Sequence, residues 1–114
     1  MNRKGEIKME VIKKFPETMD ARTQFKMMMS PEVKKMIDAE DSILEVKSWV
    51  MYKDMNYTVL TLETVDGEMF GTISETFMKA FEEIISFFGD DVGSIKVISG
   101  NSKAGRKYIN CTVE

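Results

Sequence analysis

Aromatic and cationic side chains are the residues of this chain whose chemistry suggests a binding function. An aromatic ring can stack on a nucleic-acid base, which contributes about 1–3 kcal/mol for each base. Lysine and arginine can contact the phosphates of the same strand and release its counterions. The candidates lie on predicted strands and in the last predicted hairpin: Lys47, Trp49, Tyr57, Lys96, Lys103, Arg106, Lys107 and Tyr108. We expect them to form one binding face.

Trp49 is the most informative of these candidates. In the alternation along its strand, Trp49 falls with Glu45 and Lys47 and on the opposite face from Leu44. A tryptophan on a polar strand face predicts an exposed stacking platform. The alternative is that the N-terminal segment covers the ring.

The other aromatic residues have competing interpretations. Tyr57 begins a strand and would equally shield one end of a barrel. Phe70 could join the binding face, but its pattern favours the core. Tyr52 and the phenylalanines of the predicted helix are expected in the core, as is Cys111, the single cysteine.

The charges are unevenly distributed along the chain. Its 16 basic and 19 acidic residues give a net charge of -3, which does not itself indicate nucleic-acid binding. Between Asp91 and Glu114, however, there is no acidic residue, and four of the candidate cations fall there. Because screening limits the reach of each charge to roughly 8–10 Å, a local basic strip can bind phosphate on an acidic protein. The alternative is a solvated hairpin.

Residue types that catalysis or metal binding would need are scarce. The chain has no histidine and one cysteine, which excludes a Ser-His-Asp triad, a Cys-His pair and zinc sites built on these ligands. The acidic pairs Glu82-Glu83 and Asp90-Asp91 are sequence neighbours, which is typical of a solvated helix face or loop. We therefore predict no enzymatic activity, no catalytic residue, no metal site and no cofactor.

The hydrophobic pattern indicates one domain of ordinary composition, with 43% hydrophobic and 31% charged residues. No apolar run is long enough to span a bilayer, and the N-terminus lacks the apolar segment of a signal peptide. A lone cysteine fits a reducing compartment. We expect a cytoplasmic protein without membrane contact.

Residues 41–114 show the periodicities of strands and one helix. Strands are predicted at about residues 42–52, 57–64, 68–73, 94–99 and 106–113. Asp66-Gly67 predicts a hairpin turn. The helix is expected to start in the capping-box sequence from Thr72 to Glu75, with Ser74 as a competing cap, and to end near Phe88 before Gly89. This mainly β order with one helix, β-β-β-α-β-β, predicts a five-stranded barrel of the oligonucleotide-binding (OB) type.

The residues before this barrel are predicted in two parts. We expect residues 1–18 to be a flexible leader without a role in the fold, and translation to begin at Met9. Residues 19–40 are expected to form a helical segment that packs on the barrel. One helix is expected from the cap Asp20 to Met29, and another from Ser30-Pro31 to about Ala39. This methionine-rich segment is either a lid or a contact for a partner or a second copy.

Two stretches resemble a known family. The segment from Ile95 to Cys111 (IKVISGNSKAGRKYINC) is similar to the end of small single-stranded-DNA-binding proteins from bacteriophages of Gram-positive bacteria. The segment from Phe25 to Met36 resembles their N-terminal region. The resemblance implies an OB-fold protein that coats single strands during phage replication. One departure from the resemblance is that only Glu114 follows Val113, whereas bacterial single-strand-binding proteins recruit partners through an acidic tail. We therefore expect any recruitment to use another surface.

Two function classes follow from these observations. The first is single-stranded DNA binding in phage replication or recombination, with replication or recombination proteins as further partners and a homodimer as one possible assembly. The second is a protein-interaction module that modulates a host factor, which the acidic stretch 41–91 and the methionine-rich segment favour.

Overall fold

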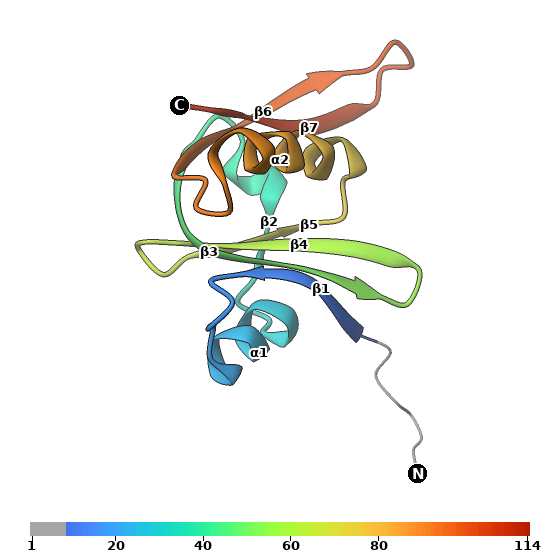
Figure 1. Ribbon diagram of the computed structural model, residues 1–114. Coiled ribbons are helices and arrows are strands. Elements are labelled where there is room, and N and C mark those ends of the chain that lie inside the picture. Colours follow the sequence, from blue (N-terminus) through green and yellow to red (C-terminus); the bar gives the residue numbers. More distant parts are fainter. Residues whose placement is uncertain (1–8) are drawn as a thin grey trace.

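A curled, barrel-like sheet with two α-helices forms this protein (Figure 1). The computed structural model describes residues 9–114. Its elements are β1 (Met9–Phe15), α1 (Ala21–Met29), β2 (Lys34–Lys35), a short 3-10 helix (Met36–Ala39), β3 (Ile43–Asp54), β4 (Tyr57–Thr64), β5 (Met69–Thr72), α2 (Glu75–Phe88), β6 (Ser94–Asn101) and β7 (Lys107–Val113). The seven strands are ordered β2-β5-β4-β3-β6-β7, and β1 also pairs with β3. The prediction of five strands is therefore wrong, because β1 and β2 add two.

The long strand β3 gives the sheet its curl. One edge of β3 pairs with β4, while β6 pairs with residues 43–45 and β1 pairs with residues 49–54. The β3–β4 register shifts between Val46 and Ser48, which makes Lys47 an extra residue in a β-bulge. A bulge bends its strand and increases the local twist. The two halves of β3 thus belong to two differently oriented parts of the sheet.

From β3 onward, the periodicity and the turn and cap residues of the sequence predict the strands and the helix well. The strands β3 to β7 and helix α2 lie within a few residues of their predicted ranges. The hairpin at Asp66-Gly67 is confirmed, with Gly67 at a φ of 88°. Of the two competing caps, Ser74 is the N-cap of α2, and its hydroxyl accepts a hydrogen bond from the backbone N–H of Phe77. Gly89 ends the helix at a φ of 86°.

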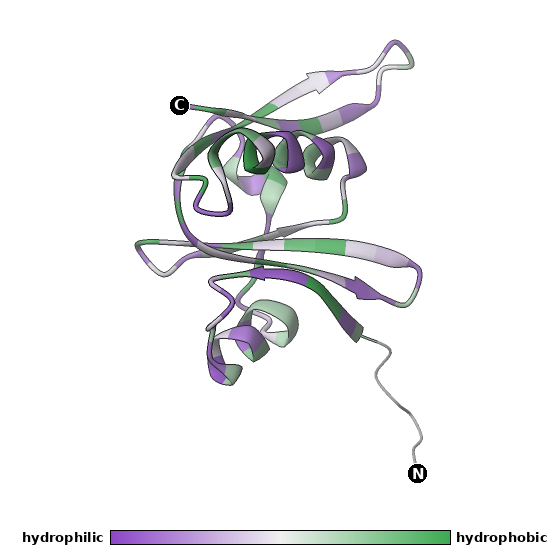
Figure 2. Cartoon of the chain, viewed as in Figure 1, coloured by the Kyte–Doolittle hydropathy of each residue, from purple (hydrophilic) through white to green (hydrophobic). Residues whose placement is uncertain are grey.

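The main core lies between the curled sheet and α2. Leu60 and Leu62 of β4 and Phe77 and Phe81 of α2 are fully buried in it, and the middle of β4 is marked as hydrophobic in Figure 2. Phe70 and Cys111 are buried there as predicted. Burial of such side chains stabilises the fold by about 1.5–3 kcal/mol each.

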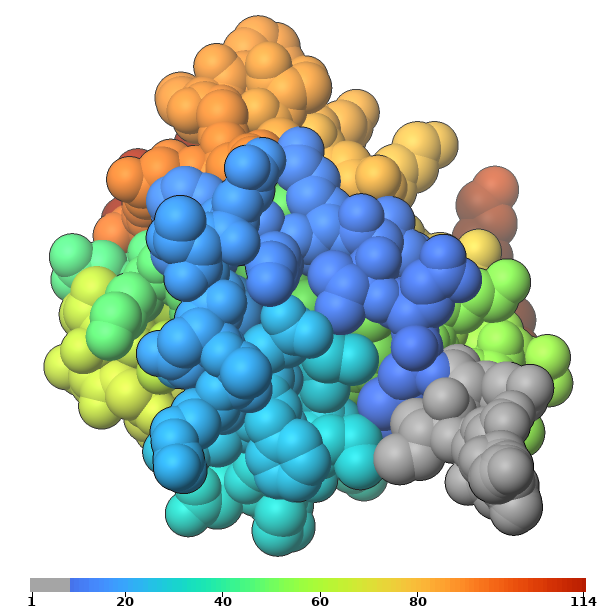
Figure 3. Space-filling model, turned by 60° about the horizontal axis from the view of Figure 1, so that its bottom comes forward, coloured from blue at the N-terminus to red at the C-terminus, as the bar shows by residue number. Residues whose placement is uncertain are grey.

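The N-terminal segment covers the opposite face of the sheet (Figure 3). A second cluster of buried residues there consists of Met19, Met27, Val50, Tyr52 and Met69. The expectation that residues 1–18 have no role in the fold is therefore wrong for residues 9–18, because β1 pairs with β3 and Phe15 packs on the main core. Residues 1–8, which would precede the proposed translation start at Met9, lie outside the described residues.

Only the first of the two predicted N-terminal helices is confirmed. Asp20 caps α1, and its side chain accepts a hydrogen bond from the backbone N–H of Thr23. The helix predicted from Ser30-Pro31 is wrong. After a turn, residues 34–35 instead form β2, which pairs in parallel with β5, and the 3-10 helix follows. Pairing with β5, a tertiary contact, overrides the helical signal.

The phenylalanines of α2 do not all lie in the core. Phe77 and Phe81 are buried as predicted, but Phe87 and Phe88 are exposed. Phe88 is 60% exposed although its spacing continues the buried stripe, so the helical period alone does not bury this last side chain.

Candidate nucleic-acid interface

The side chain of Trp49 lies inside the barrel and is fully buried. Its indole N–H donates to the backbone oxygen of Asp90 at 2.8 Å, and its ring meets Phe81 edge-on at 5.4 Å. The prediction of an exposed platform is wrong because the bulge at Lys47 inverts the alternation of β3. Leu44 faces the core before the bulge, and Trp49 faces it afterwards.

Lys47 and Tyr57 lie at opposite ends of the β3–β4 pair. Lys47 is exposed beside Val46, which pairs with Thr64, whereas Tyr57 pairs with Asp54 at the other end. At about 3.3 Å for each residue, these positions are roughly 20–25 Å apart along the strands. The predicted grouping of Lys47, Trp49 and Tyr57 on one face is therefore wrong.

The β6–β7 hairpin holds the other five predicted residues. Lys96 lies on β6, Lys103 and Arg106 lie in the connecting loop, and Lys107 and Tyr108 begin β7. The loop is closed by the Ser102 hydroxyl, which accepts from the backbone N–H of Arg106 at 3.2 Å. Within residues 9–114, no ion pair involves Lys96, Lys103 or Arg106.

Tyr108 lies across Gly100 of the neighbouring strand. The two residues are directly paired, and a Cβ at position 100 would come within 2.7 Å of the tyrosine hydroxyl oxygen. A side chain at position 100 would therefore displace the tyrosine ring from this position. The contact fixes the ring while 42% of the residue surface stays exposed, so one side of Tyr108 is free for stacking.

Lys107 is engaged in a small polar network. Its ammonium lies 2.8 Å from Oε1 of Glu40, and the hydroxyl of Ser99 donates to Oε2 of the same carboxylate. Two hydrogen bonds lower the pKa of the Glu40 carboxyl below its usual value: the one from Lys107 has the larger effect, and the one from Ser99 the smaller. Glu40 is thus an anion that already occupies the donors a phosphate would use.

An apolar groove runs beside Lys107 and Tyr108. It consists of two adjoining hollows of about 420 and 360 Å³, which share Ile37, Thr72, Ile73 and Ile109. Both volumes lie within the range of small-ligand sites. The first hollow is also lined by Val33, Lys34, Lys35, Met36, Val59 and Gly71, and the second by Ser74, Lys107 and Tyr108.

An exposed tyrosine lies near each end of this groove. Tyr108 lines one end. Tyr57 is 59% exposed and lies two residues before Val59, which lines the other end. Because alternate residues of a strand share a face, Tyr57 lies on the same side of β4 as Val59, roughly 7 Å along the strand.

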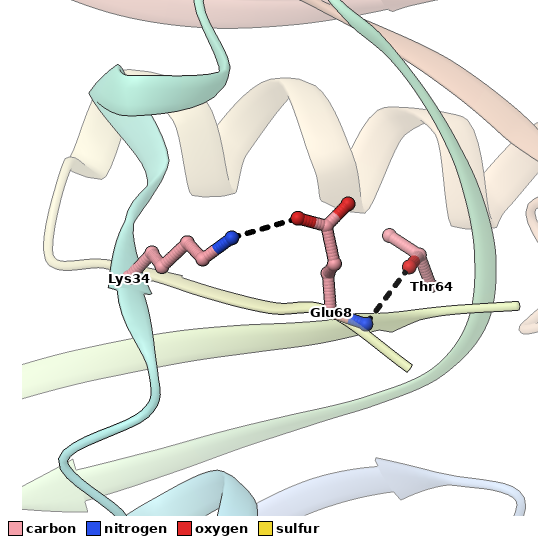
Figure 4. A network of polar contacts seen from close by, with 3 residues as sticks. All are labelled: Lys34, Thr64 and Glu68. Carbon is pink, nitrogen blue, oxygen red and sulfur yellow. Dashed lines mark hydrogen bonds and ion pairs between the residues drawn. The ribbon is translucent and has the colours of Figure 1, made fainter. Parts of the chain in front are cut away.

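Two lysines on β2 border the groove. The ammonium of Lys34 lies 2.7 Å from Oε2 of Glu68 (Figure 4). It also lies 5.5 Å from the ring centre of Phe70. Glu68 is itself anchored, because its backbone N–H donates to the Thr64 hydroxyl. Lys35 makes no ion pair within residues 9–114.

The sequence analysis missed the β2 side of this site. Lys34, Lys35, Ile37 and Ile73 were not among the predicted residues, since the segment 30–39 was expected to be helical. The adjacent pair Lys34-Lys35 is the only local signal of a cationic border there.

Comparison with known proteins does not identify a family: no family model, no curated protein and no solved structure matches this chain. In residues 9–114, no helix is long and apolar enough to cross a membrane. The same residues contain no group of three or more acidic, histidine or cysteine side chains placed to hold a metal ion.

Proposed function

We propose that this protein binds single-stranded DNA in the apolar groove between β2, β5 and β7. The observation that carries this proposal is the pair of exposed tyrosines, Tyr57 and Tyr108, near the two ends of a groove bordered by lysines. Bases stack on the tyrosines and lie against Ile37 and Ile73 between them. Lys35 and the cations of the β6–β7 loop contact the phosphates.

We further propose that the barrel is an OB-fold. The order β3, β4, β5, α2, β6, β7 matches the element order of that fold, and β3 pairs with both β4 and β6. OB-folds bind oligonucleotides on the face of their second and third strands, next to the loops after the first and the fourth strand. Here these are β4, β5, the turn before Tyr57 and the β6–β7 loop.

The biological role follows from the sequence resemblance. A single-strand-binding protein of a phage coats DNA in the bacterial cytoplasm during replication or recombination, and replication or recombination proteins would be its further partners. This assignment rests on residues 25–36 and 95–111 alone.

A protein-interaction module is the second candidate function. Much of the groove lining is aliphatic, and two of its three bordering lysines, Lys34 and Lys107, are already paired with carboxylates. A peptide with apolar side chains would suit this lining. The two functions differ in whether the isolated protein binds oligonucleotides.

Fluorescence anisotropy of a labelled oligothymidine tests the proposal directly. Wild-type protein is expected to bind saturably, with an affinity that falls as salt rises. Tyr108→Ala should weaken binding about 5- to 150-fold, corresponding to the loss of one stacking interaction of about 1–3 kcal/mol. Phe25→Ala, which removes an exposed aromatic side chain on α1, is the matched control and should leave affinity unchanged.

The cations are tested in the same assay. Lys35→Gln should reduce the slope of log affinity against log salt by about 0.7, the value for one phosphate contact on a single strand. Glu40→Gln should strengthen binding several-fold, because it releases Lys107 and Ser99 for a phosphate. Absence of oligonucleotide binding at low salt would rule out the proposal and favour the protein-interaction module.

A further inference from the structure

A projecting aromatic side chain and a hollow lie next to each other at the C-terminal end of α2. Phe87 is 84% exposed and Phe88 is 60% exposed, with ring centres 6.3 Å apart. Single exposed apolar residues are common on protein surfaces, but a contiguous patch marks an interaction site. This patch is separate from the groove proposed for DNA, because the two share no lining residue.

The hollow beside Phe87 has the size of an aromatic ring. It is an open hollow of about 230 Å³ between α2 and β7, and Phe87 itself forms part of its rim. The other lining residues are Ala80, Glu83, Ile84, Phe88, Cys111, Thr112 and Val113. A cavity of about 150 Å³ suffices to hold benzene. The small side chain of Ala80 leaves this space open on the flank of the helix.

We propose that this face binds a second copy of the chain, with Phe87 of each copy inserted into the hollow of the other. In a two-fold dimer both subunits use the same patch, so the patch must carry both a projection and a recess for it. Phe87 and the hollow beside Ala80 fulfil this requirement on one surface.

The two exposed rings supply part of the area that a dimer needs. Fully exposed aromatic side chains present about 150–250 Å², so Phe87 and Phe88 together offer on the order of 250–300 Å². A biological interface needs about 1,000 Å² in total, which is about 500 Å² from each copy. The two rings supply about half of this, and the flanking Val113, Thr112 and Glu83 side chains border them.

Packing of side chains, and not strand addition, joins the copies. The backbone N–H and C=O of Val97 bond to Ser42 and Asp41, on the side of β6 away from β7. Val97 and its partner Cys111 are therefore a pair without mutual hydrogen bonds, and the backbone groups of Cys111 point to the free edge of β7. There the N–H of Cys111 already donates to the side-chain oxygen of Asn110 at 2.8 Å. This bond blocks the middle of the edge strand from pairing with another strand.

Charge limits the affinity of this dimer. Glu83 borders the hollow, and a two-fold arrangement brings the Glu83 side chains of both copies to the same interface. Like charges at an interface oppose association. Removing this charge by Glu83→Gln should therefore strengthen the dimer.

Sedimentation velocity over a series of protein concentrations tests the proposal without DNA. The wild type should shift from monomer to dimer as concentration rises, Phe87→Ser should stay monomeric throughout, and Glu83→Gln should dimerise at several-fold lower concentration. Phe25→Ser, which removes a similarly exposed ring on α1, should behave as the wild type.

A wild type that stays monomeric at the highest concentration would overturn the proposal. A Phe87→Ser variant that dimerises like the wild type would also overturn it, and loss of the dimer in Phe25→Ser instead would place the interface on α1. Circular dichroism melting of each variant verifies folding. We expect unchanged melting, because both rings are exposed. Since no oligonucleotide is present, the outcome is independent of the proposed DNA binding.

Discussion

The position of Trp49 is decided by a single inserted residue. A period of two was expected to hold along the whole strand, but Lys47 takes an extra place opposite β4 and moves every later side chain to the other face. A bulge depends on the partner strand and leaves no local signal in the sequence. Strand β4 has no bulge of its own, and its side chains follow the expected period of two. Tyr57 is exposed and Leu60, on the opposite face, is buried.

Replacing Trp49 should destabilise the fold strongly. Trp49→Ala removes the contact with Phe81 and leaves the backbone oxygen of Asp90 without its donor, so we expect a loss of about 3–5 kcal/mol in the free energy of unfolding. Urea unfolding followed by circular dichroism measures this loss. Phe25→Ala should change the stability by less than about 0.5 kcal/mol. Equal effects of the two substitutions would contradict a buried Trp49.

The Glu40 network should make stability depend on pH in the acidic range. The pKa of Glu40 is lowered in the folded protein, so its bonds to Lys107 and Ser99 stabilise the fold above its unfolded pKa, near 4.5. This contribution is lost as pH falls below that value and through the folded pKa. Comparing thermal melting of wild type and Glu40→Gln from neutral pH downward, we expect their difference to shrink at acidic pH. A constant difference would argue against the network.

At the scale of elements, the sequence predicted those elements whose signals lie within a few residues of one another. It did not predict the strands that depend on residues far away along the chain. Helix α2 and the hairpin at Asp66-Gly67 were predicted because their caps and turns involve residues a few positions apart. Strand β1 was missed because its partners lie 34 to 45 residues away, from Trp49 for Phe15 to Asp54 for Met9. The two-residue strand β2 depends in the same way on Phe70 and Gly71.

Strand β1 is expected to be essential for stability. A chain that begins at Asp20 keeps α1 but leaves the edge of β3 at residues 49–54 unpaired and removes Phe15 and Met19 from the packed clusters. We expect a loss of at least about 3 kcal/mol, measured by urea unfolding. The full-length variant Ile12→Ala, changed at the exposed bulge residue of β1, should stay within about 0.5 kcal/mol of the wild type. A shortened chain as stable as the full chain would restore the view of a leader without a role.

At the scale of the whole molecule, the two proposed surfaces lie at opposite ends. Ser74, the N-cap of α2, lines the groove, whereas Phe87 and Phe88 lie at the other end of the same helix. Figure 1 shows the end of α2 and the C-terminus on the left and the β6–β7 loop on the right. A dimer through Phe87 would therefore leave both grooves open. Two linked grooves would bind a long strand more tightly than one, because the second contact forms within the complex.

The sequence predicted the groove only in part. Tyr108, Lys107 and the loop cations came from a hairpin that can be recognised locally, and Tyr57 from the start of a strand. Ile37 and Ile73 form the floor of the groove, and Lys35 forms its border on β2. These residues come together because β2 pairs in parallel with β5 and because Ile109 of β7 approaches them. Residues brought together only by this packing had no signal in the periodicity.

Mapping of oligothymidine binding by NMR tests the central claim most directly. Amide shifts recorded during a titration should change most at residues 57–59, 71–73 and 106–109, which surround the groove. The indole signal of Trp49 should change little, since the ring lies inside the barrel. Shifts confined to the end of α2 or to α1, or no shifts at low salt, would contradict a DNA-binding groove between β2, β5 and β7.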